Sequence, residues 1–117
     1  MALVLTKPTT ASGNADRQLY STVITIPSTH TAVVDQSMGT SVKWIITVSN
    51  TTDTVVQAYE VLAIKKGTTA VYNVYGFVGD NIDTTLSIDN VSGEIHASVM
   101  NNEMFDVVIN ITRIGSS

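Results

Sequence analysis

The sequence contains no cysteine, only two prolines and few charged residues for its size. The absence of cysteine excludes disulfide scaffolds, thiolate nucleophiles and cysteine-ligated zinc sites. Charged side chains make up 14% of the 117 residues, against about 25% in an average domain. With six Lys and Arg residues and a net charge of −4, the chain lacks the basic surface that binds nucleic-acid backbones, so we expect no nucleic-acid partner.

Leucine and alanine, the common helix formers, are also scarce. The sequence has 5 Leu and 8 Ala, but 16 Val, 11 Ile and 17 Thr. Because β-branched side chains are stiff and fit a pleated surface, this bias favours strands. It argues against helical bundles, coiled coils and βαβ folds, and the length suits one domain.

The first residues combine a short apolar run with a polar loop. The run Ala2–Leu5 is too short for the apolar region of a signal peptide or for a membrane span, so we expect synthesis in a cytoplasm and no membrane partner. The following loop contains Pro8 and Gly13 and shows no periodicity. Because such a loop is unusual inside a compact domain, we predict an N-terminal arm at 1–18 and a β-sandwich domain at 19–117.

From residue 19 onward, short apolar or alternating segments follow one another between turn signals. The predicted strands are Tyr20–Ile26, Thr31–Val34, Ser41–Ser49, Val55–Ile64, Ala70–Val78, Leu86–Asp89, Glu94–Met100 and Asp106–Ile114. About eight short strands and no convincing helix predict an all-β fold, an antiparallel β-sandwich or jelly-roll-like single domain.

The segments Val55–Ile64 and Ala70–Val78 form the strongest hairpin candidate, and both are apolar on both faces. In the second segment, alternation places Tyr75 and Phe77 on the same face. Strands that are apolar on both faces need two covering layers, so we expect another subunit to supply one of them. The predicted interface residues lie in the arm and on this hairpin: Leu3, Val4, Leu5, Tyr59, Leu62, Tyr72 and Phe77.

The sequence carries no recognisable catalytic, cofactor or metal motif. His30 and His96 lack the spacing of a metal site, residues 79–83 lack the spacing of an EF-hand calcium loop, and no serine lies in a nucleophile elbow. We therefore expect no enzyme activity, no cofactor and no metal. A trimer would gather three copies of either histidine round one axis, which leaves that alternative open. Trp44 and the four tyrosines are an alternative sugar-stacking platform, although they fit core or interface anchors better.

A series of short pieces between Val55 and Ile114 occurs in a moderately specific order. The pieces are Tyr59–Ile64, Lys66–Thr69, Val74–Gly76, Thr85–Asp89, Ser92–Gly93 and a closing run from Val108–Ile109 to Thr112–Ile114. In order and spacing, this series resembles a β-rich domain of bacteriophage virion structural proteins, which is common in tail fibres and related surface proteins of cyanophages and other marine phages.

The resemblance implies a non-enzymatic structural component of the virion that forms homo-oligomers, often trimers, and contacts other virion proteins. The chain has no repeats and no glycine-rich or heptad shaft. We therefore expect a small component that decorates a capsid, lies at the neck or baseplate, or adapts a tail fibre, after synthesis in the host cytoplasm. The alternative is a β-sandwich module that binds a carbohydrate or host receptor, with a host-surface glycan as its ligand. An exposed Trp44 or tyrosine beside Asp80 and Asp83 would favour that alternative.

Overall fold

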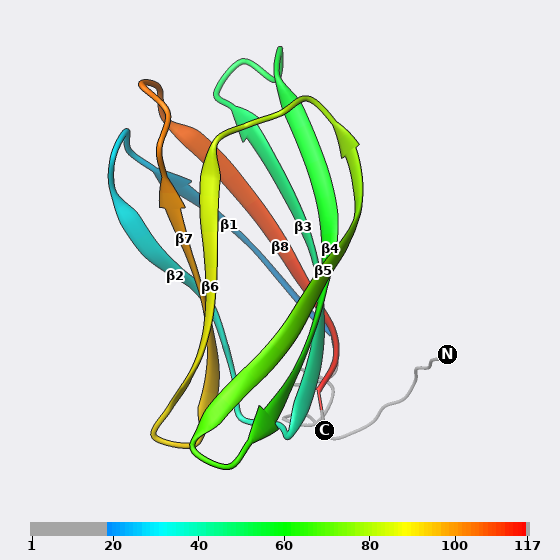
Figure 1. Cartoon of the computed structure of the whole chain (residues 1–117). Helices are drawn as coiled ribbons and strands as arrows, with labels where there is room; N and C mark the ends of the chain where they lie inside the picture. The colour runs from blue at the N-terminus through cyan, green and yellow to red at the C-terminus, as the bar shows by residue number, and fades with distance from the viewer. Residues whose placement is uncertain (1–18, 117) are drawn as a thin grey trace.

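The computed structural model describes residues 19–116, which form eight strands in two antiparallel sheets (Figure 1). The strands are β1 (Leu19–Ile26), β2 (Thr31–Ser37), β3 (Ser41–Asn50), β4 (Val56–Lys66), β5 (Thr69–Gly79), β6 (Thr84–Val91), β7 (Glu94–Asn101) and β8 (Val107–Ser116). The large sheet has the order β1-β8-β3-β4-β5, and the small sheet has the order β2-β7-β6. The two sheets pack as a sandwich, which confirms the predicted all-β class. Within residues 19–116 we find no helix that could span a membrane.

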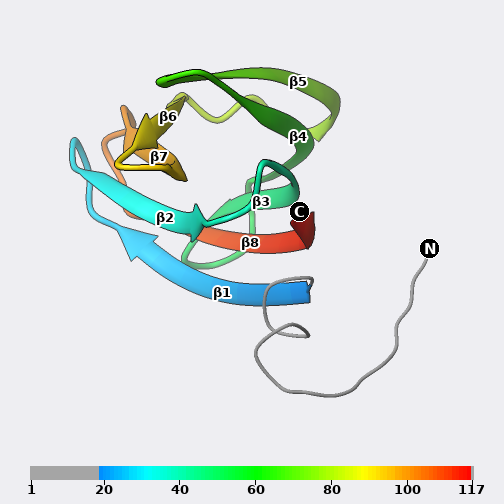
Figure 2. The ribbon, with the colours of Figure 1, turned by 90° about the horizontal axis from the view of Figure 1, so that it is seen from below.

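The large sheet curls around the small one, so that β1 and β2 face each other at one side and β5 and β6 at the other (Figure 2). Alternate residues of both sheets point into the space between them and form one apolar core. Its largest fully buried apolar side chains are Trp44, Ile26, Ile46, Ile95, Ile109, Ile111, Val42, Val48, Val61, Val99 and Val107. This core is the main source of stability, because it removes the most apolar surface from water.

All eight predicted strands are present, and their ends differ from the predicted ends by three residues at most. The largest difference is in β2, which runs past Val34 to Ser37. The polar side chains of Asp35 and Ser37 point inward and are buried there. The indole N–H of Trp44 donates a hydrogen bond to the Asp35 carboxylate, and the Gly39 N–H donates one to the Ser37 hydroxyl. The strand therefore continues through residues whose polarity alone indicates a turn.

A β-bulge at Gly76 changes the face that the end of β5 presents. The register of β4 and β5 shifts at this point, so Gly76 and Phe77 both lie opposite Tyr59. Gly76 has a φ of 71°, which glycine adopts without steric cost. The extra residue turns Phe77 inward, where its ring centroid lies 5.0 Å from that of Tyr59. The prediction that Tyr75 and Phe77 share a face is therefore wrong, because the bulge breaks the alternation.

The chain leaves the large sheet at Gly79 and Asp80. Gly79 has a φ of 95°, and a Cβ on it would run into the carbonyl oxygen of Val56. The Asp80 N–H donates to that oxygen at 2.6 Å, and Asp80 Oδ2 accepts from the Val56 N–H at 3.0 Å. This close approach ends β5 and sends residues 80–83 across to β6, at the top of the sandwich in Figure 1.

Candidate functional site

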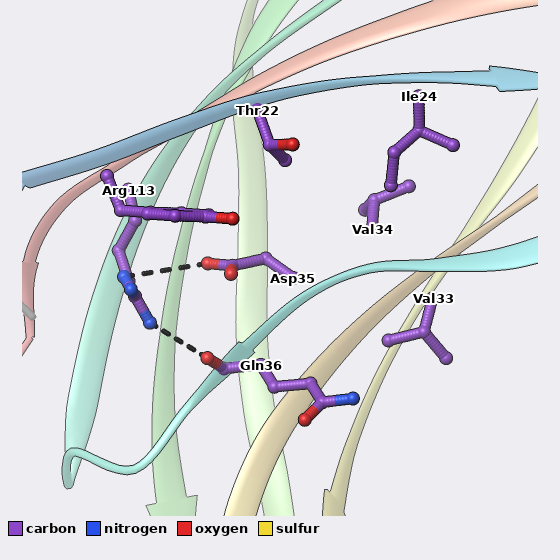
Figure 3. A pocket seen from close by; sticks show the side chains of 8 residues that line it. Thr22, Ile24, Val33, Val34, Asp35, Gln36 and Arg113 are labelled. Atoms are coloured by element: carbon purple, nitrogen blue, oxygen red, sulfur yellow. Dashed lines mark hydrogen bonds and ion pairs between the residues drawn. The ribbon is translucent and has the colours of Figure 1, made fainter.

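A surface cleft, called here the β1–β2 cleft, lies between the edge strands β1 and β2 of the two sheets (Figure 3). Its volume is about 360 Å³. Its walls are formed by Tyr20, Thr22, Ile24, Val33, Val34, Asp35, Gln36 and Arg113. A bulge in β2 after Val33 turns the next two residues inward, so that the Asp35 side chain enters the sandwich.

The charged groups of the β1–β2 cleft join the two sheets to each other. Asp35 Oδ2 accepts from the indole Nε1 of Trp44 at 2.7 Å and lies 3.6 Å from Nε of Arg113. The guanidinium also donates to the carbonyl oxygen of Gln36 at 2.8 Å and lies over the ring of Tyr20. Both charged side chains are almost fully buried, and such pairs are costly to break. The arrangement therefore fits a structural link between β2 and β8.

A second hollow, the β5–β6 cleft, lies beneath the connection from β5 to β6 and has a volume of about 440 Å³. It is lined by Gln57, Tyr59, Val74, Phe77, Asn81, Ile82, Asp83, Thr84 and Leu86. Burial raises the pKa of Tyr59 to about 12, although a hydrogen bond with Thr84 offsets part of that shift. The cleft thus combines an apolar floor with amide, carboxylate and hydroxyl groups.

Hydrogen bonds from the β7–β8 connection support the crossing segment above the β5–β6 cleft. The Asp83 N–H donates to Glu103 Oε2 at 2.7 Å, and the Asn102 N–H donates to the Asp83 carbonyl oxygen at 3.0 Å. The Asn102 amide also donates to Asp83 Oδ1 at 3.3 Å and to the Thr85 hydroxyl at 2.9 Å. These contacts hold the Asp83 carboxylate at the rim of the cleft.

The outward face of the large sheet, called here the outer face, is apolar around β4 and β5. Leu62, Ile64 and Val71 are all exposed there, and Ile64 pairs directly with Val71 across the two strands. Lys43 Nζ lies 3.0 Å from Glu60 Oε1 beside them. Hydrogen bonding and charge attraction by Glu60 raise the pKa of Lys43. The two charges offset each other, so this part of the face is close to neutral.

The structure places the predicted interface residues of the hairpin on different faces of the large sheet. Leu62 is exposed on the outer face, whereas Tyr72 and Phe77 are exposed on inward-pointing positions of the edge strand β5. Tyr59 is only 4% exposed and packs inside its own chain. The predicted arm residues Leu3, Val4 and Leu5 lie outside the described residues.

The structure also places the other side chains that the sequence singled out. Trp44 is fully buried, so it offers no surface to a sugar. Asp80 is bound to the start of β4, whereas His30 bonds the Ser28 carbonyl oxygen, and His96 lies 3.1 Å from Glu94. Among residues 19–116, no three histidine or acidic side chains are grouped as a metal site.

Gln57 is the cleft residue that the sequence reasoning missed. The next inward-pointing positions of β4 are Tyr59, Val61 and Ala63, which are apolar or aromatic, before Lys65 near the end of the strand. A glutamine in such a series is unusual, because a buried amide costs free energy unless it is hydrogen-bonded. This polar residue within an apolar alternation was the sequence signal that could have identified Gln57. The cleft residues from β5 and β6 carry no such signal, because only the fold brings them beside Gln57.

Comparisons with known proteins find a similarity in fold but none in sequence. No protein-family model matches the sequence, and no curated protein matches it significantly. Among solved structures, the tailspike protein of Acinetobacter phage vB_ApiP_P1 is similar, with a TM-score of 0.53 and 13% sequence identity. The similarity covers 98% of this chain and 24% of the tailspike chain. This chain therefore spans about a quarter of that protein's length and shares the fold of that part.

Proposed function

We propose that this chain is a non-enzymatic structural module of a phage particle, related to tail proteins, that binds copies of itself and other virion proteins. The fold supports the proposal, because a phage tailspike contains a similar domain over nearly the whole length of this chain. The sequence pieces that resemble virion proteins agree with it. The observation that carries the proposal is the apolar outer face around β4 and β5.

Solvated sheet faces usually carry polar side chains, so an apolar one indicates a contact surface. Leu62 is 52% exposed, and Ile64 and Val71 are nearly as exposed. All three lie side by side on neighbouring strands, so they form one patch. The neutral pair of Lys43 and Glu60 adds no net charge that would repel a second copy.

The edge of the large sheet next to this patch also favours association. The edge strand β5 runs from Thr69 to Gly79 without one charged residue. Edge strands are commonly blunted by lysine or proline, because their free N–H and C=O groups pair with other chains. Both residue types are absent along β5, and its bulge comes only at Gly76, so the stretch Thr69–Tyr75 is the part of this edge that suits a neighbouring strand.

The size of the outer face is adequate for a stable contact. Five strands about 4.8 Å apart and about 33 Å long give a face of roughly 800 Å². Stable interfaces bury about 800 Å² per partner. The apolar residues on β4 and β5 supply part of that area, and their burial contributes roughly 25 cal/mol per Å² before the ordering costs of association. The oligomer that we propose is a homotrimer.

Light scattering on the purified full chain tests this proposal. We expect a mass three times the 12.5 kDa of the single chain. Val71→Lys places a charge in the patch, so it should weaken association at least tenfold, a loss of about 1.4 kcal/mol.

Val33→Lys is the matched control. Val33 is 45% exposed and Val71 is 44% exposed, but Val33 lies on β2 of the small sheet. The control should keep the mass of the wild-type oligomer. A wild-type chain that stays monomeric, or a Val71→Lys chain with an unchanged mass, would contradict the proposal.

A further inference from the structure

The large sheet has two edge strands, β1 and β5, and neither carries the residues that usually prevent an edge from pairing. Neither strand contains a charged residue or a proline. The edges of the small sheet differ, because β2 has a bulge next to the buried Asp35 and β6 carries Asp89. Of the two sheets, the large one therefore suits an added strand better.

The stretch Thr69–Tyr75 of β5 precedes the bulge at Gly76 and has exposed side chains on both of its faces. Val71, Tyr72 and Asn73 follow one another and are all exposed, although alternation places Val71 and Tyr72 on opposite faces of the sheet. These two side chains are 44% and 45% exposed. A strand that adds to this edge would therefore meet free main-chain groups and an apolar or aromatic side chain on each face.

The segment of this chain that fits such an edge is the apolar run Ala2–Leu5 in the predicted arm. It carries no charge, and alternation in a strand would place Leu3 and Leu5 on one face and Val4 on the other. Both exposed faces of the β5 edge would then gain an apolar neighbour. The arm joins the sandwich at the start of β1, which is the opposite edge of the same sheet.

The linker between Ala2–Leu5 and β1 is too long for a local hairpin. It consists of residues 6–18, whereas hairpin loops usually have about two to five residues. Pairing of the run with the edge of β1 is therefore disfavoured. A fully extended linker of this length spans about 45 Å, and five strands are about 19 Å wide, so the run can reach beyond the width of its own sheet.

Two β5 edges are within this reach, that of the same chain and that of a neighbouring copy. The small sheet covers the inward face of the large sheet (Figure 2), so a path to β5 of the same chain has to cross the outer face. The arm would then lie over the patch of Leu62, Ile64 and Val71, which the proposed self-association uses. If that patch contacts another subunit, the edge left for the arm is that of a neighbouring copy.

We propose that Ala2–Leu5 of one copy adds a strand to the β5 edge of the next copy, along Thr69–Tyr75. This strand addition depends on the proposed self-association, and it names the segments that would join the subunits. Each copy donates its arm at one edge of the large sheet and accepts another arm at the opposite edge. Contacts between two different surfaces can close into a ring, as a homotrimer requires.

Paramagnetic NMR on a mixture of two full-length chains tests the pairing. Because the sequence has no cysteine, Val4→Cys accepts a single nitroxide label. This chain is mixed in urea with an isotope-labelled wild-type chain and refolded with it, so that broadening of amide signals reports contacts between copies. We expect the amides of Thr69–Tyr75 to broaden most. Broadening that is strongest at β1 or the small sheet, or that occurs only when both labels are on one chain, would overturn the proposal.

Light scattering on the same mixture separates the strand addition from the proposed function. A mass of three chains without broadening at β5 would overturn the strand addition and leave the homotrimer in place. A mass of one chain would contradict the homotrimer itself, and the strand addition with it.

Charges in the arm test the same contact without a change in the two sheets. Leu3→Asp together with Leu5→Asp should raise the dissociation constant of the oligomer at least tenfold, because an unpaired charge is costly to bury. It should also speed hydrogen exchange at the amides of Thr69–Tyr75. Thr10→Asp together with Ser12→Asp is the matched control, since it adds the same charge at the same spacing within the linker, and it should keep both wild-type values. Equal effects of the two pairs, or no effect of the first, would show that Ala2–Leu5 does not pair with β5.

Discussion

Tyr59 shows at the scale of one residue how burial changes side-chain chemistry. Burial raises the pKa of its hydroxyl to about 12, whereas a tyrosine in an unfolded chain titrates near 10. Between these two values the unfolded chain releases the proton and the folded chain retains it. Since ionisation then favours the unfolded state, the free energy of unfolding falls as the pH rises from about 10 to about 12.

We expect Tyr59→Phe to remove about 2 kcal/mol of the stability loss between neutral pH and about pH 12. Urea unfolding at both pH values gives the change in the free energy of unfolding for each chain. Comparing these changes, rather than the absolute values, removes the effect that losing the hydroxyl has at neutral pH. Tyr20→Phe is the control for the loss of a tyrosine hydroxyl, because it removes one from a side chain that is 42% exposed. A Tyr59→Phe chain with the wild-type alkaline loss would show that the hydroxyl is not buried.

At the scale of the strands, Gly79 determines where β5 ends. Gly79→Ala introduces a Cβ that collides with the Val56 carbonyl oxygen and disturbs the hydrogen bond from the Asp80 N–H to the same oxygen. We expect this change to lower the free energy of unfolding by about 3 kcal/mol in a urea titration. Gly67→Ala is the control: Gly67 also has a positive φ, but a Cβ there meets nothing within 4 Å. It should cost only about 1 kcal/mol, and equal losses would show that the collision is relieved.

The strands could be predicted from the sequence because alternating side chains report the pleat directly. β3 is the clearest case, since Val42, Trp44, Ile46 and Val48 are all buried as its alternation indicates. The face of Phe77 could not be predicted in this way. One extra residue at a bulge reverses the alternation beyond it, and only the pairing with β4 reveals that residue.

The two clefts depend on strand order, which side-chain alternation does not determine. Gln57 lies on β4, Phe77 on β5 and Thr84 on β6. They meet because residues 80–83 cross between the sheets instead of forming a hairpin within one. The Asp35–Arg113 link has the same origin, since it joins β2 to β8 across 78 positions of the chain.

At the scale of the whole molecule, the question is what covers the second apolar face of β4 and β5, for which we expected another subunit. The small sheet covers the inward face of the large one, and within residues 19–116 nothing covers the outer face of β4 and β5. The apolar residues there are the reason that we propose self-association. The β5–β6 cleft lies on the other side of the same strands.

The most direct test of the particle role is quantitative mass spectrometry of purified, salt-washed phage particles, with an isotope-labelled copy of this chain as the standard. The proposal predicts that the chain remains on the particles in a fixed number of copies that is a multiple of three. Absence of the chain from the washed particles, or a copy number that varies between preparations, would contradict a structural role in the virion.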